Sequence, residues 1–353
     1  MKLKQRDAIL IAFLLVMIGV TNPVLAAEQL KRQSGKDFTG LKSKTTIYPK
    51  WFKDTFWDLN DDIAEARKVG KTGIMIYTST KSCSYCIAFI EKSLGDPVLQ
   101  KRLRRQFDVL GLEVIADTEI TDVDGKNYVV KDFLKKYKAY FTPTLLFFGE
   151  DGEVLLVIAG YYPPTLFRHV LDYLEGGHYR KESWREYKTR VVDIYQSKAS
   201  IHFDKSLFAV SSMNLDRSKS NSGKPLLVLF EKQGCADCGK MHKEVLSVET
   251  TRSWIRRFDA TQVDASDVKT GIVKPDGGKT TPADWARELN IAYYPSFVFF
   301  DEKGKETFRI DTYTRNARLE GTLELVLARG YLDEPQLQRW RRQQFVKGQR
   351  KTE

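Results

Sequence analysis

The sequence has few cysteines and no apolar run of membrane-spanning length near its start. Only four cysteines occur among 353 residues. The apolar run at residues 8–20 is shorter than the roughly 20 residues that a membrane-spanning helix needs. Basic residues precede this run and small residues follow it, so we expect a secretory signal peptide over residues 1–26, with an uncleaved membrane anchor as the alternative. No cysteine directly follows the run, which leaves a lipid-modified amino terminus without an acceptor. The mature chain is therefore expected outside the cytoplasm, in the periplasm of a bacterium.

The composition fits neither a disordered nor a collagen-like chain. Hydrophobic residues make up 42% and charged residues 29%, as in ordinary globular proteins. The formal net charge is +11, and the basic residues are spread along the chain apart from one cluster near the end. That cluster contains Arg339, Arg341, Arg342, Lys347, Arg350 and Lys351. An exported protein meets little nucleic acid, so we expect no nucleic-acid partner. We interpret the cluster as a solvated basic helix and tail, and weak attraction to anionic lipid or to an acidic partner is the alternative.

The four cysteines belong to a long internal repeat. They form two pairs, and 152 residues separate the equivalent members of the pairs. The same offset relates two prolines, two Phe-Phe dipeptides and two glycines further along the chain. These equivalences join Pro143 to Pro295, residues 147–148 to 299–300, and Gly152 to Gly304. A duplication with so long a period indicates two copies of one domain rather than a solenoid.

Each copy has the same predicted order of elements: strand, helix, strand, helix, hairpin, helix. The strands before the cysteine pairs are continuous apolar runs, which is typical of strands buried on both faces of a sheet. This order predicts an α/β fold with a central mixed sheet flanked by helices in each copy. The predicted strands lie at residues 74–77, 107–113 and 143–148 and at residues 226–230, 258–264 and 295–300, and the closing helices lie near residues 166–174 and 319–327.

Both cysteine pairs have the Cys-x-x-Cys spacing at the predicted start of a helix. The first sulfur of such a pair lies over the helix amino terminus, where unpaired N–H groups and the helix dipole favour a thiolate. The second sulfur, one turn later, resolves the mixed disulfide. We therefore predict Cys83 and Cys235 as nucleophiles, with Cys86 and Cys238 as the resolving residues.

Two other uses of the cysteines are less consistent with the sequence. Zinc modules keep their cysteine pairs close together, whereas a whole predicted domain separates Cys86 from Cys235. A permanent disulfide across two residues closes so small a loop that it constrains the unfolded chain little. We expect no metal and no cofactor.

The repeated prolines belong to the same predicted sites. Pro143 and Pro295 each stand 60 residues after the first cysteine of their pair. A proline at the start of a strand can simply mark a sheet boundary, but the repetition favours a cis peptide bond facing the disulfide. Such a bond turns the backbone of Thr142 and Tyr294 toward a substrate peptide, so we predict these four residues as a substrate-binding surface.

These residues resemble the thioredoxin fold and, within it, the SoxW-like periplasmic thioredoxins. The second copy carries the resemblance in residues 230–246, around Gly234-Cys235-Ala236-Asp237-Cys238, and the first in residues 77–86 and in Thr142-Pro143-Thr144. The likeness spans residues 51–179 and 207–331. It implies two tandem thioredoxin-like domains, disulfide exchange with protein thiols and a cis-proline at both positions. It also implies reducing power from a membrane electron carrier of the DsbD or CcdA kind.

The sequence departs from the thioredoxin pattern in two places. Thioredoxin has a tryptophan just before the first cysteine, where Ser82 and Gly234 stand here. It also has a buried acid six residues before that cysteine, where Tyr77 and Leu229 stand here. Neither copy therefore has the usual proton acceptor.

Other charged residues near the second pair are ambiguous. Glu231 is a possible substitute for the missing acid, although we expect a solvated loop residue, and His242 is expected to be a surface or packing residue rather than a base. Asp237 disfavours a nearby thiolate, so we predict a lower reduction potential for the second pair than for the first, with Lys232 and Lys240 opposing this effect.

The predicted organisation has six parts. They are a signal peptide (1–26), a mature amino-terminal segment (27–49), thioredoxin-like domain 1 (50–181), a linker (182–206), thioredoxin-like domain 2 (207–346) and a basic tail (347–353). The leading hypothesis is an enzyme that reduces or isomerises disulfides in exported proteins. The alternative is a scaffold that keeps the fold without redox activity, because a fold does not determine a function.

Overall fold

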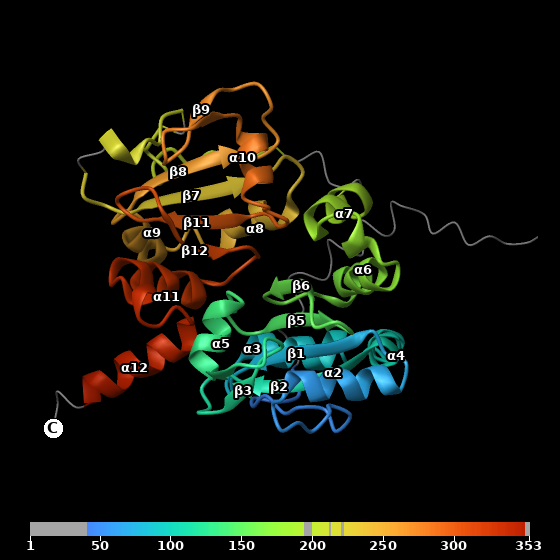
Figure 1. Cartoon of the computed structure of the whole chain (residues 1–353). Coiled ribbons are helices and arrows are strands. Elements are labelled where there is room, and N and C mark those ends of the chain that lie inside the picture. The colour runs from blue at the N-terminus through green and yellow to red at the C-terminus, as the bar shows by residue number, and fades with distance from the viewer. Residues whose placement is uncertain (1–40, 194–199, 212, 220–221, 350–353) are drawn as a thin grey trace, which may run out of the picture.

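The computed structural model describes residues 41–193, 200–211, 213–219 and 222–349. The predicted signal peptide and the first part of the segment over residues 27–49 lie outside the described residues, as does the end of the basic tail. No helix in the described ranges is both long and apolar enough to cross a membrane. Two four-stranded sheets, each flanked by helices, form the molecule, and we call the units around them the first and second domains (Figure 1).

The sheet of the first domain has the strand order β2-β1-β5-β6. β1 pairs with β2 in parallel and with β5 antiparallel, and β6 completes the hairpin with β5. The central mixed sheet predicted from the sequence is therefore confirmed. Its strands are β1 (Gly73–Ser79), β2 (Phe107–Glu113), β5 (Thr144–Gly149) and β6 (Val154–Ala159).

The sheet of the second domain repeats this topology in the order β12-β11-β7-β8. β7 pairs with β8 in parallel and with β11 antiparallel, and β11 forms the hairpin with β12. The tandem duplication inferred from the 152-residue offset is thus present in the fold. These strands are β7 (Leu226–Glu231), β8 (Asp259–Asp264), β11 (Ser296–Phe300) and β12 (Glu306–Ile310).

Helices cover both sheets, and a short two-stranded hairpin accompanies each. The helices of the first domain are α2 (Leu59–Lys68), α3 (Ser84–Ala88), a π-turn (Phe89–Ser93), α4 (Pro97–Gln106), α5 (Val130–Lys136), α6 (Pro164–Glu175), a 3-10 turn (His178–Arg180) and α7 (Trp184–Val191). Those of the second are a 3-10 turn (Arg217–Lys219), α8 (Ala236–Glu244), α9 (Glu249–Ile255), α10 (Pro282–Glu288), α11 (Asn316–Leu327), a 3-10 turn (Gly330–Leu332) and α12 (Leu337–Gln349). The hairpins are β3 (Glu119–Thr121) with β4 (Asn127–Val129), and β9 (Ile272–Val273) with β10 (Lys279–Thr280).

Alternation along the central strands produces a hydrophobic core on each face of each sheet. In the first domain, Met75 and Phe147 belong to one core while Ile76 and Phe148 belong to the other. Successive side chains of a strand point to opposite faces, so a continuous apolar run fills both cores. Every residue of β1, β5, β7 and β11 is buried. Burying one such large side chain contributes roughly 1.5–3 kcal/mol, which explains why these strands are so apolar.

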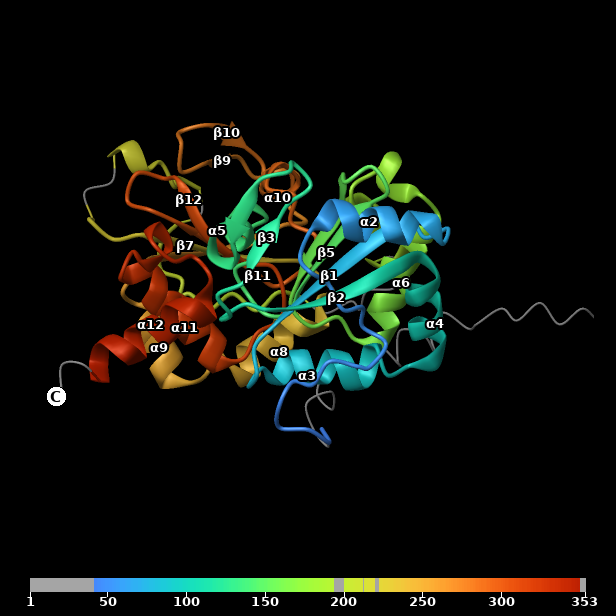
Figure 2. The same ribbon diagram turned by 60° about the horizontal axis from the view of Figure 1, so that its bottom comes forward.

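The two domains pack on each other through the loops that precede the repeated prolines. Phe141 belongs to a core cluster of the second domain, and Tyr293 packs against a core cluster of the first. α5 lies at the domain boundary in both views of the ribbon (Figure 1, Figure 2). The carboxy-terminal segment adds contacts to backbone carbonyls of the first domain. The Leu337 N–H donates to the Tyr140 carbonyl at 3.0 Å, and the Arg339 side chain donates from Nη1 to the Val114 carbonyl at 2.8 Å.

Candidate active site

The first cysteine pair forms a disulfide at the start of α3. β1 delivers the chain to this point, and Cys83 is the residue that caps the helix. The Cys86 N–H donates to the Cys83 sulfur at 3.1 Å, and the S–S bond is 2.04 Å long. Cys86 is fully buried, and Cys83 is only 7% exposed. The predicted nucleophile therefore lies at a helix amino terminus, where a thiolate is favoured, but little of it reaches solvent.

The second pair repeats this arrangement at the start of α8. Cys235 caps the helix, the Cys238 N–H donates to its sulfur at 3.0 Å, and the two sulfurs are bonded. Cys238 is buried, whereas Cys235 is partly exposed. The two sites thus share their local geometry and differ in the access of solvent to the first cysteine.

Both predicted cis peptide bonds are present. They are the bonds between Thr142 and Pro143 and between Tyr294 and Pro295. In the first domain the Thr142 carbonyl oxygen lies 3.6 Å from the Cys83 sulfur, and the Thr142 hydroxyl lies 3.4 Å from it. The proline loop of the first domain therefore contacts the disulfide, as the sequence predicts.

The second domain covers the first site. Arg318, on α11, donates from Nη2 to the Thr142 carbonyl at 2.6 Å, and its guanidinium lies 3.9 Å from the ring centre of Tyr85, inside the first Cys-x-x-Cys motif. The Arg315 N–H donates to the Tyr85 hydroxyl at 2.9 Å. Thr142 is fully buried as a result, and a peptide has no access to its carbonyl in this arrangement. Tyr294, its counterpart in the second domain, is partly exposed.

The sequence did not predict that the second domain covers the first site. Arg318 and Thr142 are 176 residues apart, so no local pattern joins them. Arg318 shares the buried face of α11 with Thr322 and Leu325, at the i, i+4 and i+7 positions. An arginine on an otherwise mostly apolar helix face is the sequence pattern that could have indicated this contact.

The expectation for Glu231 was wrong. Glu231 is the last residue of β7 and is fully buried, not a solvated loop residue. Its Oε2 atom lies 3.0 Å from His242 Nε2 and accepts a hydrogen bond from the Gln262 amide. His242 lies on α8, so this contact joins the strand before the second Cys-x-x-Cys motif to the helix that carries it. The first domain lacks this contact, because the 152-residue offset places Ser79 at the position of Glu231.

The net effect of the surroundings of Asp237 is to raise the pKa of its carboxyl, which favours the neutral form. Burial raises the pKa of Asp237, while Lys240 and Lys188 lower it. The two lysines expected to oppose Asp237 also contact other groups. Lys232 Nζ lies 3.9 Å from an Asp193 oxygen, and Lys240 Nζ lies 4.5 Å from the ring centre of Tyr313.

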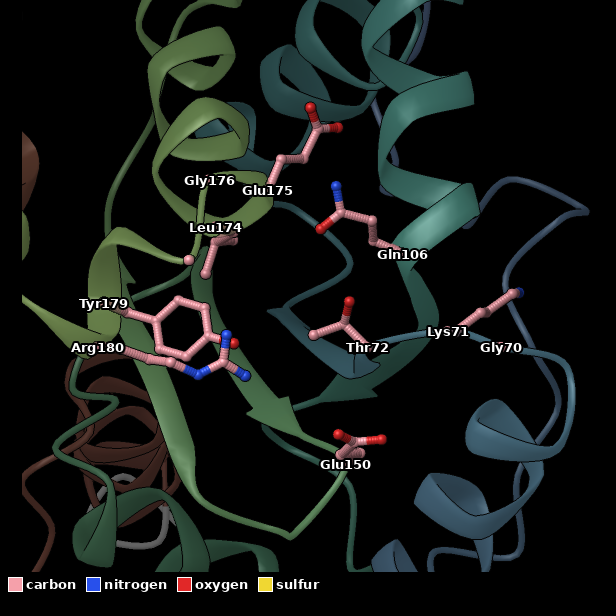
Figure 3. Close-up of a pocket in the computed structure, with 11 residues that line it drawn as sticks. Gly70, Lys71, Thr72, Gln106, Glu150, Leu174, Glu175, Gly176, Tyr179 and Arg180 are labelled. Carbon is pink, nitrogen blue, oxygen red and sulfur yellow. The ribbon is translucent and has the colours of Figure 1, made fainter.

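Several cavities among the described residues lie apart from the disulfides, and two of them concern the domains. One, of about 710 Å³, separates the edge strands β6 and β12 and is lined by Tyr162, Arg185 and Tyr293 among others. The other, of about 430 Å³, opens on the first domain, and Figure 3 shows its polar side chains. It is lined by Gly70, Lys71, Thr72, Gln106, Glu150, Leu174, Glu175, Gly176, Gly177, Tyr179 and Arg180. No cysteine lines either cavity, so we assign the exchange chemistry to the helix termini alone.

Comparison with known proteins gives the family. A family model described as a thioredoxin-like domain matches residues 59–175 and again residues 213–327. A comparison with curated proteins finds no match.

Solved structures with some similarity are thioredoxin folds. A thioredoxin-fold protein from Helicobacter pylori is 22% identical, with a TM-score of 0.32, covering 37% of this chain and 86% of that one. A thioredoxin from Thermus thermophilus is also 22% identical, with a TM-score of 0.26, covering 34% of this chain and 91% of that one. The two family matches together span well over half of the sequence, and each contains one Cys-x-x-Cys disulfide. The chain belongs to the thioredoxin-like domain family, of which it carries two tandem copies.

Proposed function

We propose that this protein is an exported thiol–disulfide oxidoreductase that reduces or isomerises disulfide bonds in other exported proteins. The observation that carries the proposal is the repeated site: in each domain a bonded Cys-x-x-Cys pair caps the helix that follows a buried central strand. A disulfide in that position is held where one of its sulfurs is stabilised as a thiolate after reduction.

The exchange reaction uses the two cysteines of a pair in sequence. In the reduced enzyme the Cys235 thiolate attacks a substrate disulfide, forms a mixed disulfide and releases one substrate thiolate, which takes up a proton. Cys238 then loses its proton and attacks the Cys235 sulfur, which frees the second substrate sulfur. Two electrons pass from the enzyme dithiol to the substrate, and the Cys235–Cys238 bond seen here is the oxidised product.

The second site is the one that we propose for substrate proteins. Cys235 and Tyr294 are partly exposed, whereas Cys83 and Thr142 are covered by the second domain. An extended peptide beside the Tyr294-Pro295 bond would present its disulfide to Cys235 through strand-like backbone hydrogen bonds.

Turnover of a protein disulfide tests the proposal. Insulin reduction and the refolding of a scrambled substrate are measured for the wild type, for Cys83→Ser, for Cys235→Ser and for the double variant. We expect activity in the wild type, a larger loss in Cys235→Ser than in Cys83→Ser, and none in the double variant. An inactive wild type, or an active double variant, rejects the enzyme and favours the redox-insensitive scaffold.

Trapping identifies the substrates. Cys238→Ser leaves the attacking cysteine without its resolving partner, so mixed disulfides accumulate and can be isolated. The matching Cys86→Ser trap at the covered first site serves as the comparison. Partner binding that survives the loss of all four cysteines supports the scaffold instead.

The location and the electron supply belong to the same proposal. Residues 1–26 have the pattern of a signal peptide, so the amino terminus of the protein recovered from the periplasm should begin after Ala26. A protein that retains residues 1–26 in the membrane fraction supports the anchor. A membrane carrier of the DsbD or CcdA kind is the proposed electron donor, and a strain without such a carrier should accumulate both pairs in the oxidised form.

A further inference from the structure

Arg318 is a buried cation that reaches from the second domain into the first active site. Its side chain extends from α11 between the rings of Tyr85 and Phe141, with centroid distances of 3.9 Å and 5.3 Å. Arg318 is 6% exposed. Its Nη2 atom donates to the Thr142 carbonyl at 2.6 Å, and that carbonyl oxygen lies 3.6 Å from the Cys83 sulfur. One backbone oxygen therefore separates the guanidinium from the predicted nucleophile.

The charge on this guanidinium has no anionic partner in the structure. Among the described residues, no carboxylate forms an ion pair with Arg318, and its Nη1 atom has no hydrogen-bond partner. Burial lowers its pKa, with an opposing contribution from Tyr85. A buried charge is costly unless an opposite charge compensates it. The oxidised site, in which both sulfurs are neutral, does not supply that charge.

We propose that Arg318 is a positioning residue of the first site, where it stabilises the thiolate that Cys83 forms on reduction. When a reducing dithiol opens the disulfide, two electrons enter the S–S bond. Cys86 takes one proton, Cys83 remains a thiolate, the donor becomes a disulfide and its second proton passes to solvent. The thiolate then supplies the negative charge that the guanidinium lacks in the oxidised state. This inference rests on the proposed redox function of the first pair.

Other titratable groups around the first site do not replace Arg318. Tyr48 and Tyr77 are neutral below the alkaline range, because burial raises the pKa of Tyr48 to about 12 and that of Tyr77 well above 10. Glu113, at the end of β2, interacts with Lys81, so these opposite charges partly cancel. Further from the sulfurs, Tyr313 donates to Glu244 at 2.7 Å and its ring centre lies 4.5 Å from Lys240 Nζ, so these opposite charges also partly cancel. Arg315 is exposed. Arg318 is the cation of this set that water does not screen.

Thiolate titration in the full chain tests the role of Arg318. The Cys235→Ser/Cys238→Ser background leaves the first pair as the chain's sole source of thiols. The ultraviolet absorbance of the thiolate is followed against pH, and the same measurement on a Cys83→Ser version identifies the Cys83 signal. We expect Cys83 to titrate below the ordinary thiol value of about 8.5. Arg318→Gln should raise this pKa by about one unit, because an opposite charge within about 4–6 Å shifts a pKa by about 1–3 units and a single carbonyl oxygen stands between these two groups.

Two further variants separate charge from packing. Arg318→Lys keeps the charge and should restore at least half of the shift, while Arg341→Gln, which removes an exposed arginine that contacts the same helix at Ala317, should leave the titration unchanged. Folding is checked by circular dichroism. An Arg318→Gln protein that is folded and titrates like its parent overturns the inference, and so does a lysine variant that behaves like glutamine.

The unsubstituted background protein provides an independent test. If Cys83 titrates at or above about 8.5 with Arg318 in place, the inference fails whatever the variants do. The titration needs no substrate, so a lowered pKa in a protein that is inactive on insulin would reject the proposed function and leave this inference standing. If the enzyme is active but Arg318→Gln leaves the Cys83 titration unchanged, the proposed function stands and this inference is rejected.

Discussion

Glu231 is enclosed at the end of β7, where its partners come from two other elements. His242 approaches from α8 and Gln262 from β8, and neither is near Glu231 in the sequence. An unpaired buried polar group costs about 1–3 kcal/mol, so the three side chains stabilise the second domain as a unit.

Replacing Glu231 should therefore lower the free energy of unfolding, and the loss should grow with the number of hydrogen bonds removed. Glu231→Ala removes the acceptor for both partners, and we expect the free energy of unfolding to fall by about 2 kcal/mol or more. Glu231→Gln keeps an acceptor oxygen and should cost markedly less. Urea unfolding of both variants measures the difference. Equal losses of unfolding free energy in the two variants would contradict the hydrogen-bond network around Glu231.

Asp204 makes a pH-dependent contribution of predictable sign. Its hydrogen bond with Arg252, at 2.6 Å, is the main reason that its pKa is lowered from 3.8 to about 2. A carboxyl with a lowered folded-state pKa stabilises the protein above its unfolded value, and this contribution is lost as the pH falls. Asp204→Asn should thus be less stable than the wild type at neutral pH, and the gap should close between pH 3.8 and about 2. Urea midpoints against pH measure the gap, with exposed Asp151→Asn as a control that shows none.

At the residue scale, the features that could be predicted are those that occur at equivalent positions in both copies of the repeat. The two cysteine pairs and the two prolines stand in register across the duplication, so their pairing and placement could be inferred. The burial of Glu231 could not be inferred, because it depends on Gln262, 31 residues away. The contact between Arg318 and Thr142 depends on how two domains meet, which no pattern within either domain encodes.

At the level of elements, most strands with predicted bounds agree with the structure to within one residue at each end, whereas the prediction over residues 74–77 covers only the middle of β1. Residues 107–113 match β2, and residues 226–230 fall one short of β7. The continuous apolar runs of β1, β5, β7 and β11 are a strong signal because both faces of these strands are buried. The hairpin of β3 and β4 was missed, since these three-residue strands contain one buried residue, Ile120, and so leave no such run.

The helix after the first cysteine pair differs from its counterpart. α3 ends at Ala88 and passes into the π-turn Phe89–Ser93, whereas α8 continues to Glu244. The π-turn brings the Ser93 hydroxyl to the Tyr162 carbonyl at 2.6 Å. α4 then begins after Asp96, whose side chain caps it, with Pro97 in the first turn.

α7 should depend on its amino-terminal cap. Ser183 and Glu186 form a capping box, in which each side chain accepts a hydrogen bond from the backbone N–H of the other residue. Ser183→Ala should lower the free energy of unfolding by about 1 kcal/mol, and Ser183→Thr, which keeps the hydroxyl, should lower it less. Thermal unfolding monitored by circular dichroism compares them. Identical midpoints for the alanine and threonine variants would show that the cap does not matter.

At the scale of the whole molecule, an equivalent residue from each domain packs against the other domain. Phe141 and Tyr293 are related by the 152-residue offset, and each packs on a core cluster of the other domain. Tyr140 adds to this contact, because its ring stacks on Phe308 with a centroid distance of 5.3 Å. The same duplication thus accounts for the two domains and for equivalent residues through which they contact each other.

Loosening this contact should expose the first disulfide. Tyr140→Ala removes the ring that stacks on Phe308, so the cover over Cys83 should open more often. We expect dithiothreitol to reduce the first disulfide several-fold faster than in the wild type, with little change at the second. Alkylation and mass spectrometry report each pair separately. Tyr179→Ala, in the cavity of Figure 3, is the control. Equal acceleration at both disulfides would mean general destabilisation.

The cavity between β6 and β12 has a consequence for solubility. Each of these strands is the end strand of its sheet, with a row of backbone groups that the sheet leaves unpaired. Both line the same cavity, so each of these edges has the other domain beside it. We therefore expect a foreign chain that would extend either sheet at β6 or β12 to meet the other domain first, which should lower the tendency of these edges to aggregate.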